Sequence, residues 1–171
     1  MLKIGDTLPD VTLFEYINEA TEGCSIGPQP VPARAAAAGK TVVLFAVPGA
    51  YTPTCSARHL PGYVEQIEAL RAAGADEVWC LAVNDAFVMG AWGREQGANG
   101  KVRMLADGSA DFARAADLVL DLTAKGLGVR SQRYAAVVVD GVVRALDVES
   151  GGQFEVSSAE AALARLKSVK A

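Results

Sequence analysis

The sequence has 171 residues, of which 51% are hydrophobic and 21% are charged, and its formal net charge at pH 7 is −4. This length suits one compact domain, and this composition is typical of a globular chain and not of a disordered one. The acidic balance and the scattered lysines and arginines exclude the basic surface of a nucleic-acid-binding protein. We therefore expect a single domain over residues 1–171 without a nucleic-acid partner.

Targeting and metal-binding patterns are missing from the sequence. The opening MLKIGDTLPD lacks the apolar core of a secretory signal, and the longest apolar run, residues 42–47, is too short to span a bilayer. The three cysteines lie far apart, at 24, 55 and 80, and the single histidine completes no metal-type spacing. We expect a cytoplasmic protein with no metal, no cofactor and no membrane partner.

The first half of the chain predicts one strand and one helix after a poorly patterned start. Residues 1–20 indicate extended segments and turns, and the prolines at 28, 30 and 32 predict an irregular surface segment over residues 23–40, with one helical turn over 34–38 ended by Gly39. The run TVVLFAV at 41–47 is typical of a strand buried on both faces. After the loop PGAYTPT, an apolar stripe from Leu60 to Leu70 predicts a helix to about Ala73, kinked early by Pro61.

The second half alternates strands and helices before a hairpin. We expect strands at 77–83 and 102–105, each followed by a helix, with Asp85 and Ser109 as the N-caps. Asp140-Gly141 predicts a hairpin between 134–139 and 142–146, and Ser157 with Glu160 forms a capping box for the last helix. The order β-α-β-α-β-α, hairpin, α predicts a thioredoxin-like α/β fold, in which helices flank a mixed central sheet.

Cys55 lies where this fold collects reactive groups, at the end of a strand and the start of a helix. The N-terminal end of a helix favours a thiolate, with Thr54 as the expected N-cap and the hydroxyl of Thr52 within reach of the sulfur. Position alone also allows a cysteine that merely packs. A thioredoxin-type dithiol would need cysteine at Thr52, and a phosphatase-type Cys-x5-Arg loop would need arginine at Pro61.

The stretch from Pro48 to Ser56, PGAYTPTCS, resembles the active-site signature of peroxiredoxins, Pro-x-x-x-Thr-x-x-Cys. With the following HLPG it looks like the type II subgroup, whose members depend on glutaredoxin or thioredoxin. Almost the whole chain shares this resemblance, and only about residues 15–40 match loosely. Further matching segments lie at 83–92, 105–112, 125–135 and 149–160.

The resemblance implies a role for each matching residue. Cys55 would attack a peroxide and become a sulfenic acid. Thr52 would bind the substrate oxygen, Pro48 would shield the sulfur, and the backbone N–H groups of Thr54 and Cys55 would complete the oxygen cradle. An arginine before the hairpin would favour the thiolate and steady the departing oxygen.

Two arginines compete for that last role. The family's arginine directly precedes the first apolar residue of the strand, here Tyr134, so we expect Arg133, with Arg130 as a possible assistant. His59, one turn after the nucleophile, is expected near the site, where a packing role is more common than a catalytic one for a lone histidine.

The resemblance implies a thiol-dependent peroxidase that reduces hydrogen peroxide and alkyl hydroperoxides, in antioxidant defence and redox homeostasis. Cys80 is a possible resolving cysteine, but its mid-strand position is typical of a buried structural thiol. At ~3.3 Å per strand residue it lies roughly 10 Å below the site, so a bond to Cys55 would require local unfolding. Cys24 is expected to be incidental. Glutathione with glutaredoxin, or thioredoxin, is therefore the expected reductant.

Two other classes of function stay open at this level: a redox sensor that passes oxidation from Cys55 to a partner, and a holdase chaperone. Turnover with a reductant separates a peroxidase from a sensor, which reacts once. Relatives of this type are often homodimers that pack near the active-site loops, and we expect Phe87 and Trp92 to contribute to such a face.

Overall fold

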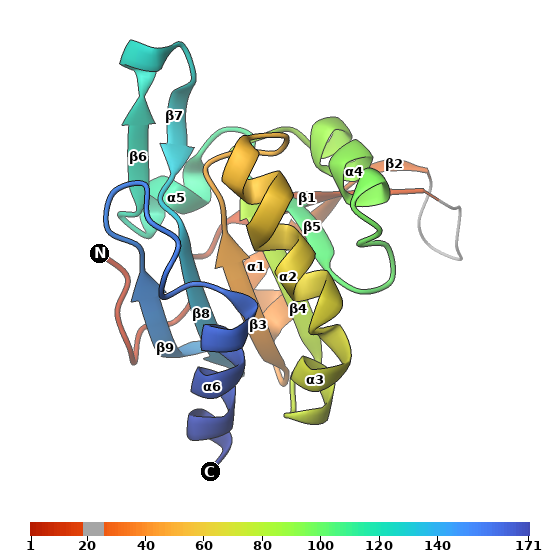
Figure 1. Cartoon of the computed structure of the whole chain (residues 1–171), viewed down its shortest axis with the longest axis vertical. Helices are drawn as coiled ribbons and strands as arrows, with labels where there is room; N and C mark the ends of the chain where they lie inside the picture. Colours follow the sequence, from red (N-terminus) through yellow and green to blue (C-terminus); the bar gives the residue numbers. More distant parts are fainter. Residues whose placement is uncertain (19–25) are drawn as a thin grey trace.

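A seven-stranded mixed sheet organises the chain in the computed structural model, which describes residues 1–18 and 26–171 (Figure 1). Its strands are β1 (Thr12–Ile17), β2 (Gly27–Pro32), β3 (Thr41–Ala46), β4 (Glu77–Ala82), β5 (Arg103–Ala106), β8 (Tyr134–Val139) and β9 (Val142–Val148). Two shorter strands, β6 (Val119–Leu122) and β7 (Gly128–Ser131), pair separately. The helices are α1 (Ala33–Ala37), α2 (Leu60–Glu65), α3 (Ile67–Ala72), α4 (Ala86–Glu95), α5 (Asp111–Ala115) and α6 (Ala159–Lys170).

The strand order is β2-β1-β5-β4-β3-β8-β9. Strands β3, β4 and β5 are parallel, and every other neighbouring pair in this sheet is antiparallel. The predicted thioredoxin-like architecture, a parallel centre with an antiparallel hairpin at one edge, is therefore confirmed. Asp140 and Gly141, both with positive φ, make the predicted turn of that hairpin.

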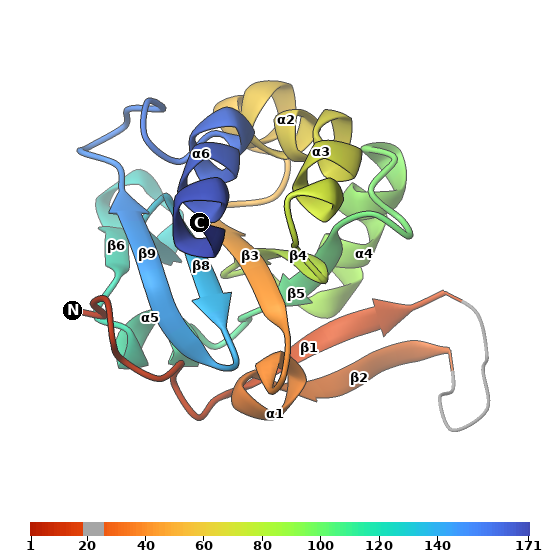
Figure 2. The same cartoon turned by 90° about the horizontal axis from the view of Figure 1, so that it is seen from below.

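Helices cover both faces of the sheet, as Figure 2 shows. Helices α2, α3, α4 and α6 pack on one face, and α1 and α5 pack on the other. All six residues of β3 are buried because both of its faces are covered, which explains its continuous apolar run. In β4 the side chains alternate, so that Cys80 points into the same core layer as Cys55 and Trp79 points into the opposite layer.

The proline-rich segment is a strand, so the prediction of an irregular segment over 23–40 was wrong for residues 27–32. Strand β2 lies at one edge of the sheet and pairs only with β1. Its prolines fall at every second position, so their missing N–H groups can all face away from β1 while the residues between them donate. The predicted helical turn is confirmed as α1, and Gly39 follows it with φ +71°.

The first long helix is interrupted and not continuous to Ala73. A π-helical turn spans Cys55–His59, where the Leu60 N–H donates to the Cys55 carbonyl, and α2 and α3 are separated at Gln66. Pro61 lacks the N–H that a regular helix needs at that point, so the wider turn lies directly before it. Thr54 has helical dihedral angles and makes no side-chain cap, which corrects its assignment as the N-cap.

Two further capping predictions were wrong, whereas Asp85 caps α4 as expected by accepting from the Val88 N–H. Helix α5 is capped by Asp107, which accepts from two N–H groups of its first turn, and not by Ser109. Helix α6 is capped by Ser158, because the Ser157 hydroxyl donates to Glu149 instead. The β6–β7 arm, which projects from the body in Figure 1, was also not predicted.

Candidate active site

The loop that carries the candidate nucleophile connects the end of β3 to the π-helical turn. The Thr52 hydroxyl donates to the Gly49 carbonyl at 2.7 Å, and the Ala50 N–H donates to the Asn84 side-chain oxygen at 2.9 Å. Tyr51 has φ +64°, a left-handed conformation that is costly outside glycine and is found at functional loops. The internal Thr52–Gly49 bond and Asn84, two residues after β4, thus hold this loop in one geometry, a role of Asn84 that the sequence did not reveal.

Cys55 begins the π-helical turn and is completely buried. The next residue is held by the Trp92 indole, whose N–H donates to the Ser56 hydroxyl at 3.0 Å. Pro48 and Thr52 in the loop, and Thr54 in the helical turn directly before Cys55, are half-buried. A nucleophile enclosed in this way can meet only a small reactant without opening of the structure.

Arg133 contacts the sulfur directly. Its Nη2 donates to Cys55 Sγ at 3.2 Å, and the residue is only 9% exposed. The sheet causes this contact: Ala46 pairs with Tyr134, so the end of β3 that leads into the cysteine loop lies beside the start of β8, directly after Arg133. The structure thus brings together the cysteine and the arginine that the sequence singled out.

The charge of Arg133 has no carboxylate partner among the ion pairs of the described residues. A buried cation without an anion is costly, and ionisation of a thiol in contact with it supplies the missing negative charge. The geometry therefore favours the thiolate form of Cys55, which is the nucleophilic form.

His59 lies on the other side of the guanidinium. Its Nδ1 is 2.8 Å from Arg133 Nη1, and its Nε2 is 2.9 Å from the Ser157 carbonyl oxygen. Arg133 can only donate and a carbonyl can only accept, so the ring must be neutral, with its proton on Nε2. Burial and the charge of Arg133 lower the pKa of His59 to about 3, which agrees with this tautomer.

Arg130 does not contact the sulfur. Its Nε donates to the Leu127 carbonyl at 2.8 Å, and its Nη1 lies 3.4 Å from the carbonyl oxygens of Pro48 and Val83. Gly49 makes room for it, since a Cβ there would come within 2.7 Å of Arg130 Nη1. Arg130 therefore ties the β6–β7 arm to the active-site loop, while Arg133 faces the nucleophile.

Cys80 takes no part in the contact between Cys55 and Arg133. Cys55 and Cys80 are both free thiols. Cys80 is buried in the sheet, opposite Phe45 of β3, and burial raises the pKa of its thiol well above the ordinary value, with Cys55 adding to the effect. Cys24, the third cysteine, lies outside the described residues.

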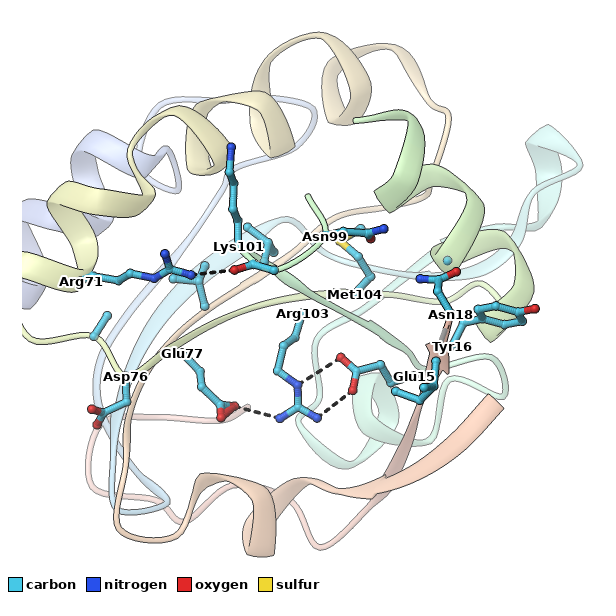
Figure 3. Close-up of a pocket in the computed structure, with 16 residues that line it drawn as sticks. Glu15, Tyr16, Asn18, Arg71, Asp76, Glu77, Asn99, Lys101, Arg103 and Met104 are labelled. Carbon is cyan, nitrogen blue, oxygen red and sulfur yellow. Dashed lines mark hydrogen bonds and ion pairs between the residues drawn. The ribbon is translucent and has the colours of Figure 1, made fainter. Parts of the chain in front are cut away.

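A separate cavity of about 510 Å³ lies beside β1 and β5, away from Cys55 (Figure 3). At its floor Arg103 makes ion pairs with Glu15 and Glu77 at 2.9 and 2.8 Å. Although burial opposes it, hydrogen bonds from Trp79, Arg103 and Lys40 lower the pKa of Glu77 to about 2. These ion pairs leave Arg103 and both carboxylates with partners, and they link strands β1, β4 and β5. We therefore assign this cluster a role in the stability of the sheet.

A cluster of metal ligands and a membrane-spanning helix are both absent from the described residues. No group of three or more His, Cys, Asp or Glu side chains in residues 1–18 and 26–171 is placed to hold a metal ion. Within the same ranges, none of the helices combines the length and the apolar character needed to cross a bilayer.

Comparison with known proteins places this geometry in a family context. The Redoxin family profile matches residues 3–163. Peroxiredoxin-2B of Arabidopsis thaliana is 46% identical over 160 residues, which cover 93% of this chain and 94% of that protein. The reduced Prx3 of Vibrio vulnificus, solved in complex with H2O2, is 48% identical with a TM-score of 0.89, covering 97% of this chain and 99% of that one.

A solved structure from Burkholderia cenocepacia is also similar, with 60% identity and a TM-score of 0.94 over 96% of this chain and 97% of that one. It was described provisionally as a thioredoxin reductase. The dithiol chemistry of that class needs two neighbouring cysteines, and this sequence has no Cys-x-x-Cys.

Proposed function

The chain belongs to the peroxiredoxin family, and from this premise we propose that it reduces hydrogen peroxide and alkyl hydroperoxides with Cys55 as the nucleophile. The contact between Arg133 and the Cys55 sulfur is the observation that carries the proposal. The H2O2 bound to the Vibrio vulnificus relative supports the choice of substrate.

The reaction follows from the geometry. A lone pair of the Cys55 thiolate attacks one oxygen of the peroxide ROOH, the O–O bond breaks, and RO⁻ leaves and takes up a proton to form ROH. The sulfur becomes a sulfenic acid, Cys–SOH, and is oxidised by two electrons while the peroxide is reduced by two. Arg133 stabilises the negative charge as it passes from sulfur to the leaving oxygen.

Thr52, Pro48 and the backbone of Thr54 supply the remaining parts of the proposed pocket. The Thr52 hydroxyl donates to Gly49, so its oxygen is left to accept a hydrogen bond from the peroxide O–H. We assign to Pro48 the role of shielding the sulfur, and to the N–H groups of Thr54 and Cys55, at the start of the helical segment, the binding of the peroxide oxygen.

We propose an external thiol as the reductant, glutathione with glutaredoxin or thioredoxin. Cys80 is buried within the sheet with a raised thiol pKa, which argues against it as the resolving partner. A thiol RSH converts Cys–SOH into Cys–S–SR and water, and a second thiol releases Cys55 and forms RS–SR. This cycle needs a reducing compartment, which supports a cytoplasmic location.

Peroxide consumption tests the proposal. The wild type should turn over with glutathione and glutaredoxin or with the thioredoxin system, and C55S should lose all turnover while keeping its fold. Substantial activity of C55S would contradict the mechanism. A wild type that reacts once and stalls with every reductant would indicate a sensor instead.

Mass spectrometry identifies the resolving thiol. After one equivalent of peroxide in the presence of glutathione, we expect a glutathione adduct on the peptide that carries Cys55. A dominant intramolecular disulfide without that adduct would contradict external resolution, and C80S gives the matched control because it should form the same adduct.

We further propose a homodimer that packs through the exposed aromatic face around Phe87. Phe87 is 63% exposed and Phe14 is 44% exposed, and both line one shallow hollow. Trp92 does not belong to this face, contrary to expectation, because it is fully buried. Sedimentation of the wild type against F87E checks the proposal, which predicts a dimer for the first and a monomer for the second.

A further inference from the structure

A buried carboxylate stands at the far end of the hydrogen-bond chain that reaches the sulfur. We propose that Glu149 is a positioning residue, which holds Arg133 against Cys55 by fixing Ser157 and, through it, His59. The inference rests on the proposed peroxidase function for its catalytic meaning, although the contacts that carry it are structural. Glu149 directly follows β9 and one residue, Val148, separates it from Asp147.

Glu149 closes the segment that leads to α6 into a tight loop. Its carboxylate accepts from the N–H groups of Glu155, Val156 and Ser157 at 2.8–2.9 Å and from the Ser157 hydroxyl at 2.6 Å. The residue is only 6% exposed. Although burial opposes it, the hydrogen bond from the Ser157 hydroxyl and those from the backbone lower the pKa of Glu149, so the group is an anion at neutral pH. One carboxylate thus fixes three consecutive peptide groups.

The loop presents one carbonyl to the active site. The Ser157 carbonyl oxygen accepts from His59 Nε2 at 2.9 Å and from the Tyr63 hydroxyl at 2.9 Å. This contact sets the proton on Nε2 and leaves a lone pair on Nδ1. Without a carbonyl at this position, only the contact with Arg133 would define the tautomer and the orientation of the ring.

The ring then orients the guanidinium. Arg133 Nη1 is 2.8 Å from His59 Nδ1, and Nη2 is 3.2 Å from the Cys55 sulfur. These two contacts together define the plane of the guanidinium group. A second connection runs through the backbone, where the Glu149 N–H donates to the Arg133 carbonyl at 2.9 Å. The loop also places Phe154 over His59, with ring centroids 4.8 Å apart.

This arrangement explains why the anion is kept at a distance. A carboxylate in direct contact with Arg133 would neutralise the cation and compete with the thiolate for it. Neutral groups, a carbonyl and an imidazole, transmit the orientation without supplying an opposite charge. Glu149 therefore fixes the arginine in place and leaves its charge available for Cys55.

Three variants isolate the role. Glu149→Ala removes the anchor of the loop, and Glu149→Gln keeps an oxygen that can accept from the same N–H groups but removes the charge. Asp147→Asn is the matched control, because Asp147 lies near the end of β9, two positions before Glu149, and its ion-pair partner is the exposed Arg165.

Two readouts report on the site directly. The first is the pH profile of alkylation of Cys55 by iodoacetamide, followed on its own peptide, together with the rate constant for H2O2. The second is the ¹⁵N NMR signature of the imidazole, which is assigned without ambiguity because His59 is the only histidine in the sequence.

We expect Glu149→Ala to slow the peroxide reaction by about tenfold to a hundredfold, the size of effect that a displacement of about 1 Å produces. In this variant the pH profile for alkylation of Cys55 should shift to higher pH. The ¹⁵N NMR signals of His59 should change from those of the Nε2-protonated form to those of a mixture of tautomers. Glu149→Gln should recover most of the rate, and Asp147→Asn should match the wild type in both readouts. A folded Glu149→Ala protein with wild-type profiles would overturn the inference.

If the Glu149→Ala protein does not fold, the Glu149→Gln protein tests the role of Glu149 by itself. Loss of the charge should then slow the peroxide reaction by about threefold and broaden the tautomer signal, and wild-type values for both would overturn the inference. A wild-type protein that does not react with peroxide would contradict the proposed function alone, since the alkylation profile and the NMR signature still judge the role of Glu149.

Discussion

The guanidinium of Arg133 and the sulfur of Cys55 lie 3.2 Å apart although 78 residues separate them in the chain. The antiparallel pairing of β3 with β8 produces this contact, because it sets the strand end that leads to Cys55 beside the strand start that follows Arg133. The site is therefore a property of the sheet register. A slip of one residue would turn the side chain of Arg133 to the other face.

Replacement of Arg133 should impair peroxide reduction more than replacement of Arg130. We expect R133M to lower kcat/KM about 100-fold to 1000-fold, since it removes the group that stabilises the developing charge. R133K keeps a charge but not the fork that reaches both His59 and Cys55, so an intermediate loss is expected. Stopped-flow kinetics checks this, with R130K as the control expected to lose less than tenfold. Equal losses for R133M and R130K would contradict the assignment.

Two substitutions of His59 separate its two contacts. H59N retains an acceptor near the position of Nδ1, toward Arg133, whereas H59Q retains a donor near the position of Nε2, toward Ser157. Because the contact to Arg133 positions the catalytic cation, we expect H59N to keep at least about tenfold more kcat/KM for H2O2 than H59Q. The reverse order would show that the contact to Ser157 matters more.

The Thr52 hydroxyl should contribute to peroxide binding and not to the nucleophile. T52V removes the acceptor for the peroxide O–H, and one such hydrogen bond in a charged site corresponds to a loss of roughly tenfold to a hundredfold in kcat/KM. T52S retains the hydroxyl and should stay within about threefold of the wild type. Iodoacetamide needs no such acceptor, so its reaction with Cys55 in T52V should be nearly unchanged. A parallel fall in both rates would argue for distortion of the loop instead.

His59 should make the stability of the fold dependent on pH in the acidic range. Its pKa is about 3 in the folded protein and about 6.5 in the unfolded chain, so unfolding takes up a proton between these values. The free energy of unfolding therefore falls as the pH falls, by about 1.4 kcal/mol per pH unit for this group. Between pH 6.5 and 4.5 the change is about 2.3 kcal/mol, because the unfolded-state group is already half protonated at pH 6.5.

Urea unfolding of the wild type and H59Q at these two pH values measures the effect. The carboxylates are shared by both proteins, so the difference between their pH dependences reports on His59. Between the two pH values, the free energy of unfolding should fall further for the wild type than for H59Q. The difference between the two falls should equal the contribution of His59 given above. Identical pH dependences would mean that His59 is charged or solvated in the folded state.

The elements that the sequence predicted correctly are those whose signal is local and redundant. The buried run of β3, the Asp140-Gly141 turn and the Asp85 cap each depend on a few neighbouring residues, and the structure confirms them. The wrong predictions concern residues whose hydrogen bonds go to distant partners. Ser157 was expected to cap α6, but a buried carboxylate eight residues earlier accepts from its hydroxyl. The prolines of β2 were interpreted as breakers because an edge position cannot be recognised without the neighbouring strand.

By itself the sequence determined the fold class and the family, and it singled out Cys55 as the candidate nucleophile. Strand and helix periodicity depends on neighbouring residues, and the motif around Cys55 occupies a few consecutive positions. Only the tertiary structure decided which tautomer His59 adopts and where the anion of Glu149 is placed, and it showed that Arg133, the arginine expected from the resemblance, faces the sulfur. Those answers depend on distances of about 3 Å between segments far apart in the chain, and only the packing of the sheet and its loops sets such distances.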